Sequence, residues 1–326
     1  MDIQVCGKLT GRKLEQWKNL MLRSSLEPDT RTDITVLVWE GEQLAAAGSR
    51  LGNLLKCIAV EEAYQGMDLT ATVLTQLRQD AFEAGFTHLF LYTKPKNLLQ
   101  FSSLFFYPVA QTEQVLLMES EPNGIAKFLE TLPVPHKGGK AGALVMNCNP
   151  FTLGHRYLIE TAAKECDWVY VFVLSEEQPP FPAADRLKLV QEGTTDLTNV
   201  TVLPTGPYLL SAATFPTYFL PDREQAPRIQ CLLDIAVFSK YFIPKFGITS
   251  RYVGTEPYSP MTDRYNAALR EQLSIELREI PRMESANGPI SASHVRAALE
   301  RNDLQQLRTL VPPTTFHYLT AFLKED

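Results

Sequence analysis

The N-terminal part of the chain combines amphipathic helix patterns with short apolar runs. Apolar residues recur every four positions from Leu69 to Ala81, which predicts one buried face of a helix. Two apolar runs flank a turn sequence at Gly41 and predict a β-hairpin. This mixture predicts an α+β domain, with helices at 11–23 and from Leu69 onward and strands at 34–39, 44–48, 54–60, 88–92 and 109–118.

Beyond residue 142, short apolar runs alternate with helical patterns. Alternation of this kind predicts a parallel sheet with helices on both faces. Ligands of such sheets bind beyond the carboxyl ends of the strands, so the loops after Met146, Leu174 and Val253 form the candidate site. We expect strands at 143–146, 168–174, 200–203 and 250–253, and helices at 154–166, 185–193 and 228–241.

The segment 132–142 interrupts both patterns, because prolines and glycines within it break any regular element. A chain of 326 residues is long enough for about two domains. We therefore predict one domain at 1–131, a linker at 132–141 and a second domain at 142–326.

The composition is that of a globular protein with a mild excess of acidic residues. The chain has 31 Lys and Arg against 37 Asp and Glu, a net charge of −6, which argues against nucleic acid as a partner because phosphate binding needs a basic surface. No apolar run reaches the ~18 residues that cross a bilayer, and the N-terminus lacks a signal-peptide pattern, so we expect no membrane partner. The five cysteines form no C-x-x-C pair, which predicts a cytoplasmic protein without a protein-held metal.

The loop after the strand at 143–146 runs from Asn149 to His155 and ends in a Gly-His pair at the start of a helix. Gly154 lacks a Cβ, so a phosphate can approach the backbone closely there. His155 lies in the first helical turn, where free N–H groups favour anions, and Thr152 adds a hydroxyl donor. By itself, this pattern fits a capping or packing histidine at least as well as a catalytic one.

A second candidate segment, from Ile290 to Arg296, follows a Gly-Pro turn and opens another helix. Ser291 and Ser293 would ordinarily be helix caps. However, two hydroxyls, free N–H groups and an arginine one turn further on also suit the β- and γ-phosphates of a nucleotide. His294 is predicted to lie at the surface or behind the site.

The two segments resemble the motifs of nucleotidyltransferases related to class-I aminoacyl-tRNA synthetases. That superfamily has an H/T-x-G-H loop after its first strand and an I-S-x-S/T-x-[IV]-R segment near its end, and the chain carries both in this order. The resemblance implies a Rossmann-like domain that binds ATP with Mg²⁺ on the phosphates and attack at the α-phosphate. It assigns catalytic roles to His155, Thr152 and Arg296, and nucleotide binding to Asn149, Phe151, Gly154, Ile290, Ser291 and Ser293.

Under the same resemblance, Gly254, Thr255 and Glu256 are similar to the turn that recognises the base or ribose, although an ordinary strand-to-helix turn fits equally well. Arg186, near a predicted helix start, is interpreted as a solvated helix charge in preference to a substrate cation. The uncharged stretch 211–219 suits either a small-molecule pocket or a buried loop.

Residues 34–118 resemble the GNAT acetyltransferase fold. A strand ends at Val60, and the segment from Gln65 to Leu69 opens a helix where the GNAT pattern Q-G-x-G-L presents backbone amides to the pyrophosphate of CoA. Asp68 replaces the second glycine of that pattern, so the segment also fits a plain helix start with an acidic residue at the positive end of the dipole.

Nearly the whole chain resembles the citrate lyase ligase family, which joins a GNAT-like part to such a nucleotidyltransferase. The similar stretches are 145–147, 149–157, 213–219, 253–257 and 290–293. The resemblance implies a ligase that activates acetate with ATP as acetyl-adenylate. It then acetylates the thiol of the CoA-like prosthetic group on the acyl-carrier subunit of citrate lyase, releasing AMP and pyrophosphate. Two alternatives stay open: an adenylyltransferase for a phosphate acceptor such as phosphopantetheine or a pyridine mononucleotide, and a non-catalytic module that senses ATP or acyl groups.

Overall fold

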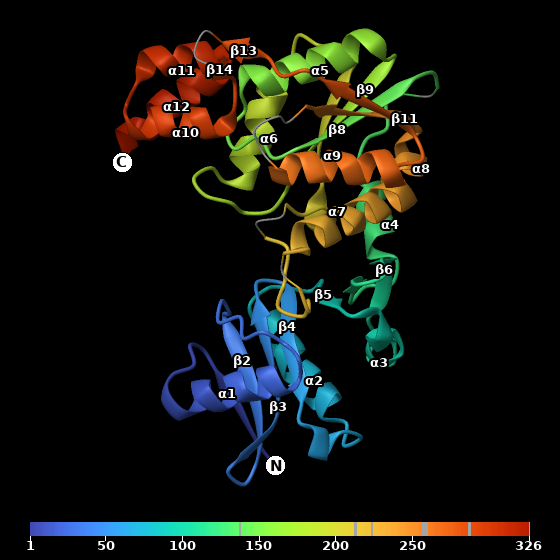
Figure 1. The fold of residues 1–326 in the computed structure, drawn as a ribbon, viewed down its shortest axis with the longest axis vertical. Helices are drawn as coiled ribbons and strands as arrows, with labels where there is room; N and C mark the ends of the chain where they lie inside the picture. The colour runs from blue at the N-terminus through green and yellow to red at the C-terminus, as the bar shows by residue number, and fades with distance from the viewer. Residues whose placement is uncertain (137, 212–213, 223, 256–259, 286–287, 326) are drawn as a thin grey trace. The chain divides into compact units, whose positions relative to one another are not determined.

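The computed structural model describes residues 1–136, 138–211, 214–222, 224–255, 260–285 and 288–325, with backbone only at 260–265, 285 and 324–325. Its contacts divide the chain into two units. The first comprises Met1–Gly124 and Pro216–Ile229, and the second comprises Ile125–Phe215 and Gln230–Asp326. Each unit has its own sheet (Figure 1).

The first unit contains a seven-stranded sheet in the order β1-β2-β3-β4-β5-β7-β6. Neighbouring strands are antiparallel except β4 and β5, which are parallel. The predicted hairpin is confirmed as β2 and β3, and the strand predicted at 54–60 is confirmed as β4. The strands are β1 (Asp2–Cys6), β2 (Ile34–Glu40), β3 (Gln43–Leu51), β4 (Leu54–Val60), β5 (Phe90–Thr93), β6 (Tyr107–Gln111) and β7 (Leu116–Glu119).

Helices α1 (Gly11–Arg23) and α2 (Leu69–Glu83) confirm the two helices predicted for this unit. The apolar stripe of α2 packs against Val36 and Val38 of β2. Leu37 lies between them and is also buried, and strand alternation turns it to the other face of the sheet. Helix α1 packs against β3 and β4 and buries Trp17 completely.

One strand prediction was wrong, because residues 109–118 form parts of two strands, β6 and β7. Thr112 makes the turn between them: its hydroxyl oxygen accepts hydrogen bonds from the N–H groups of Gln114 and Val115 at 3.4 and 3.2 Å. Such local side-chain bonds compete with a continuous ladder. A short helix, α3 (Leu98–Ser102), precedes β6.

The second unit contains a parallel five-stranded sheet in the order β10-β9-β8-β11-β12. The first strand in sequence, β8, lies at the centre and the order reverses between β8 and β11, as in doubly wound folds. The α/β fold class and the parallel sheet are therefore confirmed. The strands are β8 (Ala141–Met146), β9 (Trp168–Val173), β10 (Val200–Pro204), β11 (Ile248–Gly254) and β12 (Glu276–Ile280), and a separate pair consists of β13 (Glu284–Ser285) and β14 (Gly288–Pro289).

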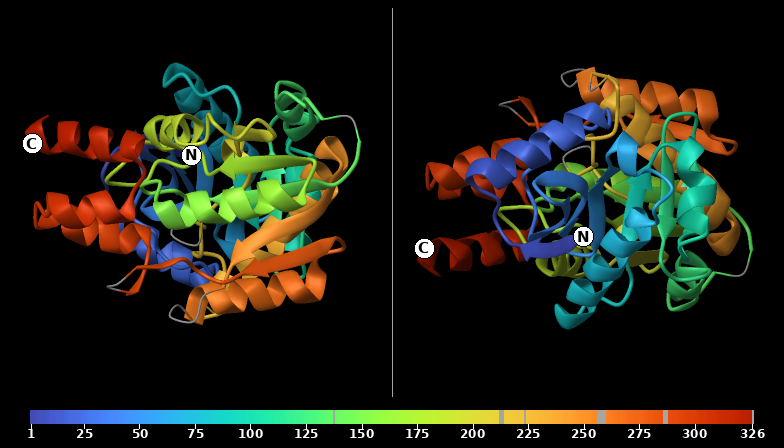
Figure 2. Two further views of the ribbon diagram at one scale, coloured as in Figure 1. Left: turned by 90° about the horizontal axis from the view of Figure 1, so that it is seen from above. Right: turned by 90° about the horizontal axis from the view of Figure 1, so that it is seen from below.

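Helices cover both faces of this sheet, as predicted (Figure 2). On β9, Val171 packs in a cluster with residues of α5 and α6, whereas Phe172 on the opposite face packs edge-on against Phe242 and Phe246. The helices are α4 (Gly124–Glu130), α5 (Leu153–Glu165), α6 (Ala183–Glu192), α7 (Ala226–Val237), α8 (Ile243–Phe246), α9 (Pro260–Gln272), α10 (Ala292–Glu300), α11 (Leu304–Leu310) and α12 (Pro313–Glu325). Short 3₁₀ turns cover Glu62–Tyr64, Pro95–Asn97 and Gly206–Tyr208, and a π-helical turn, Phe238–Phe242, joins α7 to α8.

The segment Pro216–Ile229 belongs with the first unit although it follows most of the second sheet in sequence. Tyr218 accepts a hydrogen bond at its carbonyl from the Glu27 N–H at 2.7 Å, and its hydroxyl donates to the Tyr92 carbonyl at 3.0 Å. The predicted limits 1–131, 132–141 and 142–326 stay a prediction. Within the described ranges, no helix has the length and apolar character needed to cross a membrane.

Candidate active site

Thr152 caps α5 and forms a reciprocal pair with His155 at the carboxyl edge of the parallel sheet. The Thr152 hydroxyl oxygen accepts a hydrogen bond from the His155 backbone N–H at 3.2 Å. His155 Nδ1 in turn accepts one from the Thr152 backbone N–H at 3.1 Å. Only 1% of Thr152 is exposed. The hydroxyl that the sequence suggested as a phosphate donor is therefore engaged in holding His155.

These contacts determine where the His155 imidazole carries its proton. Because Nδ1 accepts a backbone hydrogen bond, the neutral ring is protonated at Nε2. Burial, with a smaller contribution from the positive charge of Arg282, lowers the pKa of His155 to about 4. The ring lies parallel to that of the buried Phe151, with 6.1 Å between centroids. At neutral pH, His155 thus offers an uncharged Nε2–H donor.

The two motif segments lie against each other in the structure. A Cβ on Gly154 would stand 2.9 Å from the Ile290 carbonyl oxygen. The group that approaches this glycine closely in the structure is therefore the Ile290 backbone. Arg296 Nη1 donates to the Asn149 carbonyl at 2.6 Å. Packing therefore brings together the loop before α5 and the start of α10, which are far apart in sequence.

Hydroxyl groups gather at the start of α10. Ser291 Oγ accepts a hydrogen bond from the His294 N–H at 3.2 Å and lies 2.9 Å from Ser293 Oγ. Ser291 is half-buried and Ser293 is exposed. His294 is exposed, as predicted, with its Nδ1 2.9 Å from the Pro289 carbonyl oxygen. The serine hydroxyls lie at the positive end of a helix dipole, where anions are stabilised.

The turn after β11 is held from two sides. The Thr255 N–H donates to the Ile280 carbonyl at 2.9 Å, and the Thr255 carbonyl accepts from Arg282 Nε at 3.1 Å. At Gly254, no described atom lies within 4 Å of the position a Cβ would take, so the space beside this turn is open. Glu256, predicted to act with these two residues, lies outside the described residues.

The side chains of Asn149 and Phe151 point inward. Asn149 is 5% exposed, and its Nδ2 donates to the Pro179 carbonyl at 3.0 Å. Its Oδ1 is buried and has no hydrogen-bond partner among the described groups. Phe151 is fully buried and supports the loop through packing.

Arg186 is fully buried, so the interpretation as a solvated helix charge was wrong. Its guanidinium donates to the carbonyl and to Oδ1 of Asn147, at 2.8 and 2.5 Å, and to the Glu176 carbonyl. It therefore braces the loop that leads to Asn149. The missed signal was periodicity, because Arg186 shares a helix face with the buried Leu189 and Val190.

Sequence reasoning also missed Gln178 and Arg282, which have no motif around them. Gln178 Oε1 accepts from Asn147 Nδ2 at 2.5 Å. The stretch 211–219 is partly described: Thr214 and the Ser211 N–H bond to the Glu176 carboxylate, and Phe215 is buried. In the described residues, no cluster of three or more His, Cys, Asp or Glu side chains could hold a metal ion.

Residues 141–319 match the family model described as the citrate lyase ligase C-terminal domain, which covers more than half of the chain. The chain belongs to the citrate lyase ligase family. Its relatives include the [citrate [pro-3S]-lyase] ligase of Escherichia coli strain K12, 38% identical over 97% of this chain and 92% of that protein. The enzyme of the same name from Klebsiella pneumoniae is 39% identical over 93% of this chain and 90% of the relative.

Solved structures similar to one part of the chain or the other have been found. An acyl-CoA N-acyltransferase from Pseudomonas aeruginosa is 14% identical, with a TM-score of 0.32, over 37% of this chain and 100% of that one. A putative nicotinate-nucleotide adenylyltransferase from Vibrio parahaemolyticus is 19% identical, with a TM-score of 0.34, over 56% of this chain and 99% of that one. The citrate lyase ligase relatives are named as enzymes, and they match nearly the whole chain.

Proposed function

We propose that this chain is an AMP-forming acid–thiol ligase that acts on citrate lyase. It activates acetate with ATP as acetyl-adenylate and passes the acetyl group to the thiol of the CoA-like prosthetic group on the acyl-carrier subunit. AMP and pyrophosphate are released. We place this activity in the cytoplasm, without nucleic acid or membrane as partners.

The observation that supports adenylation most directly is the neutral His155 at the crossover between β8 and β11. Its Nε2–H is a preorganised donor whose orientation Thr152 fixes through Nδ1. Negative charge grows on the α-phosphate oxygens when acetate attacks the phosphorus, and donors held in place before reaction stabilise such charge best. The imidazole also gains no second proton at neutral pH, because its pKa of about 4 lies far below neutrality.

The start of α10 is suited to the leaving pyrophosphate. Ser291 and Ser293 supply hydroxyls, and the first N–H groups of the helix have no partners within the helix. Arg296 anchors to the Asn149 carbonyl and so keeps α10 against the loop before α5. Mg²⁺, when bound, would be held by the ATP phosphates and would offset their charge.

Acetate-dependent exchange between pyrophosphate and ATP tests this function. The reverse of adenylation incorporates labelled pyrophosphate into ATP only if the acyl-adenylate forms. We expect exchange that requires acetate and no carrier protein. Exchange driven only by phosphopantetheine or a pyridine mononucleotide would identify the adenylyltransferase alternative. The absence of exchange with any acceptor would identify the non-catalytic module.

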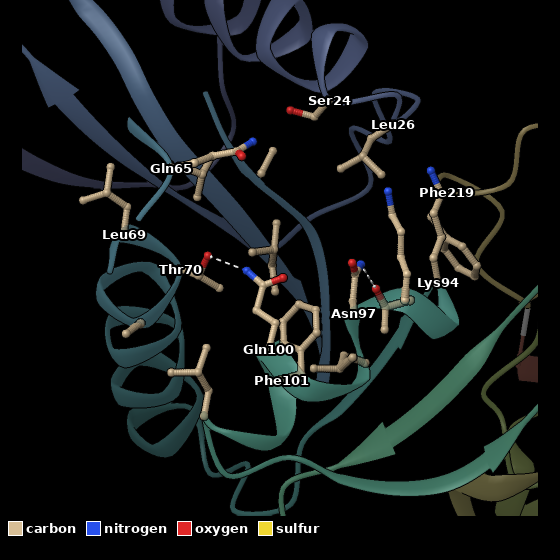
Figure 3. Close-up of a pocket in the computed structure, with 18 of the residues that line it drawn as sticks. Ser24, Leu26, Gln65, Leu69, Thr70, Lys94, Asn97, Gln100, Phe101 and Phe219 are labelled. Atoms are coloured by element: carbon tan, nitrogen blue, oxygen red, sulfur yellow. Dashed lines mark hydrogen bonds between the residues drawn. The ribbon is translucent and has the colours of Figure 1, made fainter. Parts of the chain in front are cut away.

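A cavity of about 830 Å³ in the first unit is suited to the carrier's prosthetic arm (Figure 3). The parallel ladder between β4 and β5 ends at Leu55 and Leu91, and the cavity is lined by later residues of both strands, including Val60 and Thr93. Beyond this point, no pairing between β4 and β5 is recorded among the described residues. An extended arm with amide groups can bond to such an edge as an added strand does.

The ends of this cavity carry charge of both signs. Lys94 and Lys96 line it, and burial together with the charge of Lys96 lowers the pKa of Lys94. Gln100 and Thr70 also line the cavity, and Gln100 Nε2 donates to Thr70 Oγ1 at 3.1 Å (Figure 3). Asp68 lines the cavity at the start of α2 in the left-handed conformation, φ +53°, that glycine most readily adopts. The two lysines favour an anionic group on the arm.

Calorimetric titration with CoA tests the cavity separately from adenylation. We expect binding by the full chain and about tenfold weaker binding by the double variant Lys94→Ala, Lys96→Ala. Lys18→Ala, which removes an exposed cation from α1 in the same unit, should bind as the unaltered chain does. Equal CoA binding by the double variant and the unaltered chain, or no binding by either, would contradict the proposal that the arm occupies this cavity. The proposal that the chain activates acetate would still stand.

A further inference from the structure

Arg282 lies beside the turn after β11 and close to the segment that opens α10, although no motif includes it. It follows the end of β12, in the short segment before β13. Two contacts of this segment reach different loops. Arg282 Nε donates to the Thr255 carbonyl at 3.1 Å, and the carbonyl of the next residue, Met283, accepts from the Ile290 N–H at 3.1 Å.

The Ile290 turn also lies close to the backbone beside His155. The Ile290 carbonyl lies 2.9 Å from the position of a Cβ on Gly154, the residue before His155. On the other side, the Thr255 N–H donates to the Ile280 carbonyl at 2.9 Å, so Thr255 is held at both its N–H and its carbonyl by this one segment. A displacement of Arg282 would therefore shift the turn after β11 relative to the start of α5.

The charge of Arg282 also acts on the His155 ring, where it contributes to the lowered pKa. Three other arginines of neighbouring elements are directed elsewhere. Arg156 on α5 pairs with Glu160 and Asp196, Arg186 on α6 bonds to the loop after β8, and Arg296 on α10 bonds to the Asn149 carbonyl. Among the described groups, Arg282 is the charged side chain that contributes to lowering the pKa of His155.

We propose that Arg282 is a positioning residue for adenylation, which fixes the turn at Thr255 and the turn at Ile290 around His155 and supplies a fixed positive charge beside the phosphate-binding face. This inference rests on the proposed function for its catalytic consequence. Its structural part, the coupling of Arg282 to His155, can be measured without any activity.

Two substitutions separate the effect of the Arg282 charge from the effect of its contact to Thr255. Arg282→Gln removes the charge, whereas Arg282→Lys keeps it and alters the contact to Thr255. Arg278→Gln is the matched control, because Arg278 lies four residues earlier on β12 and pairs with Glu165 and Glu276, away from the candidate site.

The first measurement is an NMR titration of the five histidines, with His155 assigned from His155→Gln. In the unaltered chain we expect the His155 signal to stay constant between about pH 5.5 and 8, because its pKa lies near 4. Arg282→Gln should raise that pKa, so that the signal begins to move at the acidic end of this range. Arg282→Lys and Arg278→Gln should resemble the unaltered chain. An unchanged His155 titration in Arg282→Gln overturns the coupling.

The second measurement is acetate-dependent pyrophosphate exchange. Arg282→Gln should reduce kcat/KM for ATP by about ten- to a hundredfold, the effect of one lost charge-assisted contact. Arg282→Lys should recover part of this loss, and Arg278→Gln should stay within about twofold of the unaltered chain. Equal losses in Arg282→Gln and Arg278→Gln overturn the proposal. If the unaltered chain shows no exchange, the proposed function fails, and the titration alone still decides whether Arg282 acts on His155.

Discussion

The helices α5 and α10 begin alike in sequence but present their histidines in opposite ways. Each has a hydroxyl cap followed three residues later by histidine, and each cap accepts the histidine N–H at 3.2 Å. His155 then turns Nδ1 back to accept from the Thr152 N–H, so its proton lies on Nε2. His294 Nδ1 instead faces the Pro289 carbonyl and must carry the proton. The two helix starts therefore share a capping pattern, but the partner of Nδ1 differs, and with it the ring nitrogen that carries the proton.

The largest expected effect comes from exchanging His155, and not His294, for alanine. His155→Ala should reduce acetate-dependent exchange by about 10²- to 10⁴-fold, because it removes the preorganised donor. His294→Ala should change the rate by less than about twofold, because the ring is exposed and directed at Pro289. Exchange rates and thermal unfolding of both variants check this. Near-normal exchange by His155→Ala would show that the site has been assigned to the wrong helix.

Glycines in two of the loops provide the next comparison. Gly154→Ala should lower the free energy of unfolding by about 1–3 kcal/mol, because the new Cβ meets the Ile290 carbonyl oxygen. Gly254→Ala should leave it within about 0.5 kcal/mol, because described atoms leave open space there. Urea unfolding measures both. Equal stabilities for the two variants would contradict the close packing of α10 on α5.

The protonation of His155 predicts how stability depends on pH. An unfolded histidine has a pKa of about 6.5, whereas folding lowers that of His155 to about 4. Between these values the unfolded chain binds a proton that the folded chain does not bind. This contribution to stability is complete above about pH 6.5 and decreases as the pH falls toward 4. Urea unfolding of His155→Gln should show a shallower decrease over this interval, and an identical slope would contradict a ring that stays neutral in the folded chain.

The smallest effects are expected at the two caps. Thr152→Ala and Ser291→Ala should each lower the free energy of unfolding by about 1 kcal/mol, the usual contribution of a hydroxyl cap. Both should also reduce exchange: Thr152→Ala removes the hydroxyl that contacts the His155 ring, and Ser291→Ala removes a hydroxyl proposed to bind the pyrophosphate. Thr309→Ala, which removes an exposed hydroxyl of α11 outside the candidate site, serves as the control. Equal kinetic losses for Thr152→Ala and Thr309→Ala would contradict the orienting role.

Hydrophobic periodicity predicts most of the fold, and its failures have physical causes. It predicts α1 with the bounds that the structure has, and four of the five strands in the parallel sheet. It misses β12, an edge strand in which Glu276, Arg278 and Glu279 mask the apolar alternation. It merges β6 and β7, because the turn at Thr112 depends on a side chain bonding to nearby backbone.

The candidate site was predictable at the level of loops and less so at the level of atoms. Two motifs and the alternation of strands with helices indicate which loops belong to the site. They do not reveal that the Thr152 hydroxyl is engaged by His155 or that Arg186 is a buried brace. Those facts depend on long-range packing, as does the position of Arg282 beside the turn after β11. Residues without a motif are found only when the chain is folded.

The path of Pro216–Ile229 makes the two units interlaced, unlike separable modules joined by a tether. A gene fragment ending near residue 131 would encode the first sheet without Tyr218, leaving the Glu27 N–H and the Tyr92 carbonyl without their native partners. The remaining fragment would carry Tyr218 and Phe219, which are buried in the intact chain, with no first unit to cover them. We therefore expect a fragment ending near residue 131 to unfold more readily than the first unit does in the full chain.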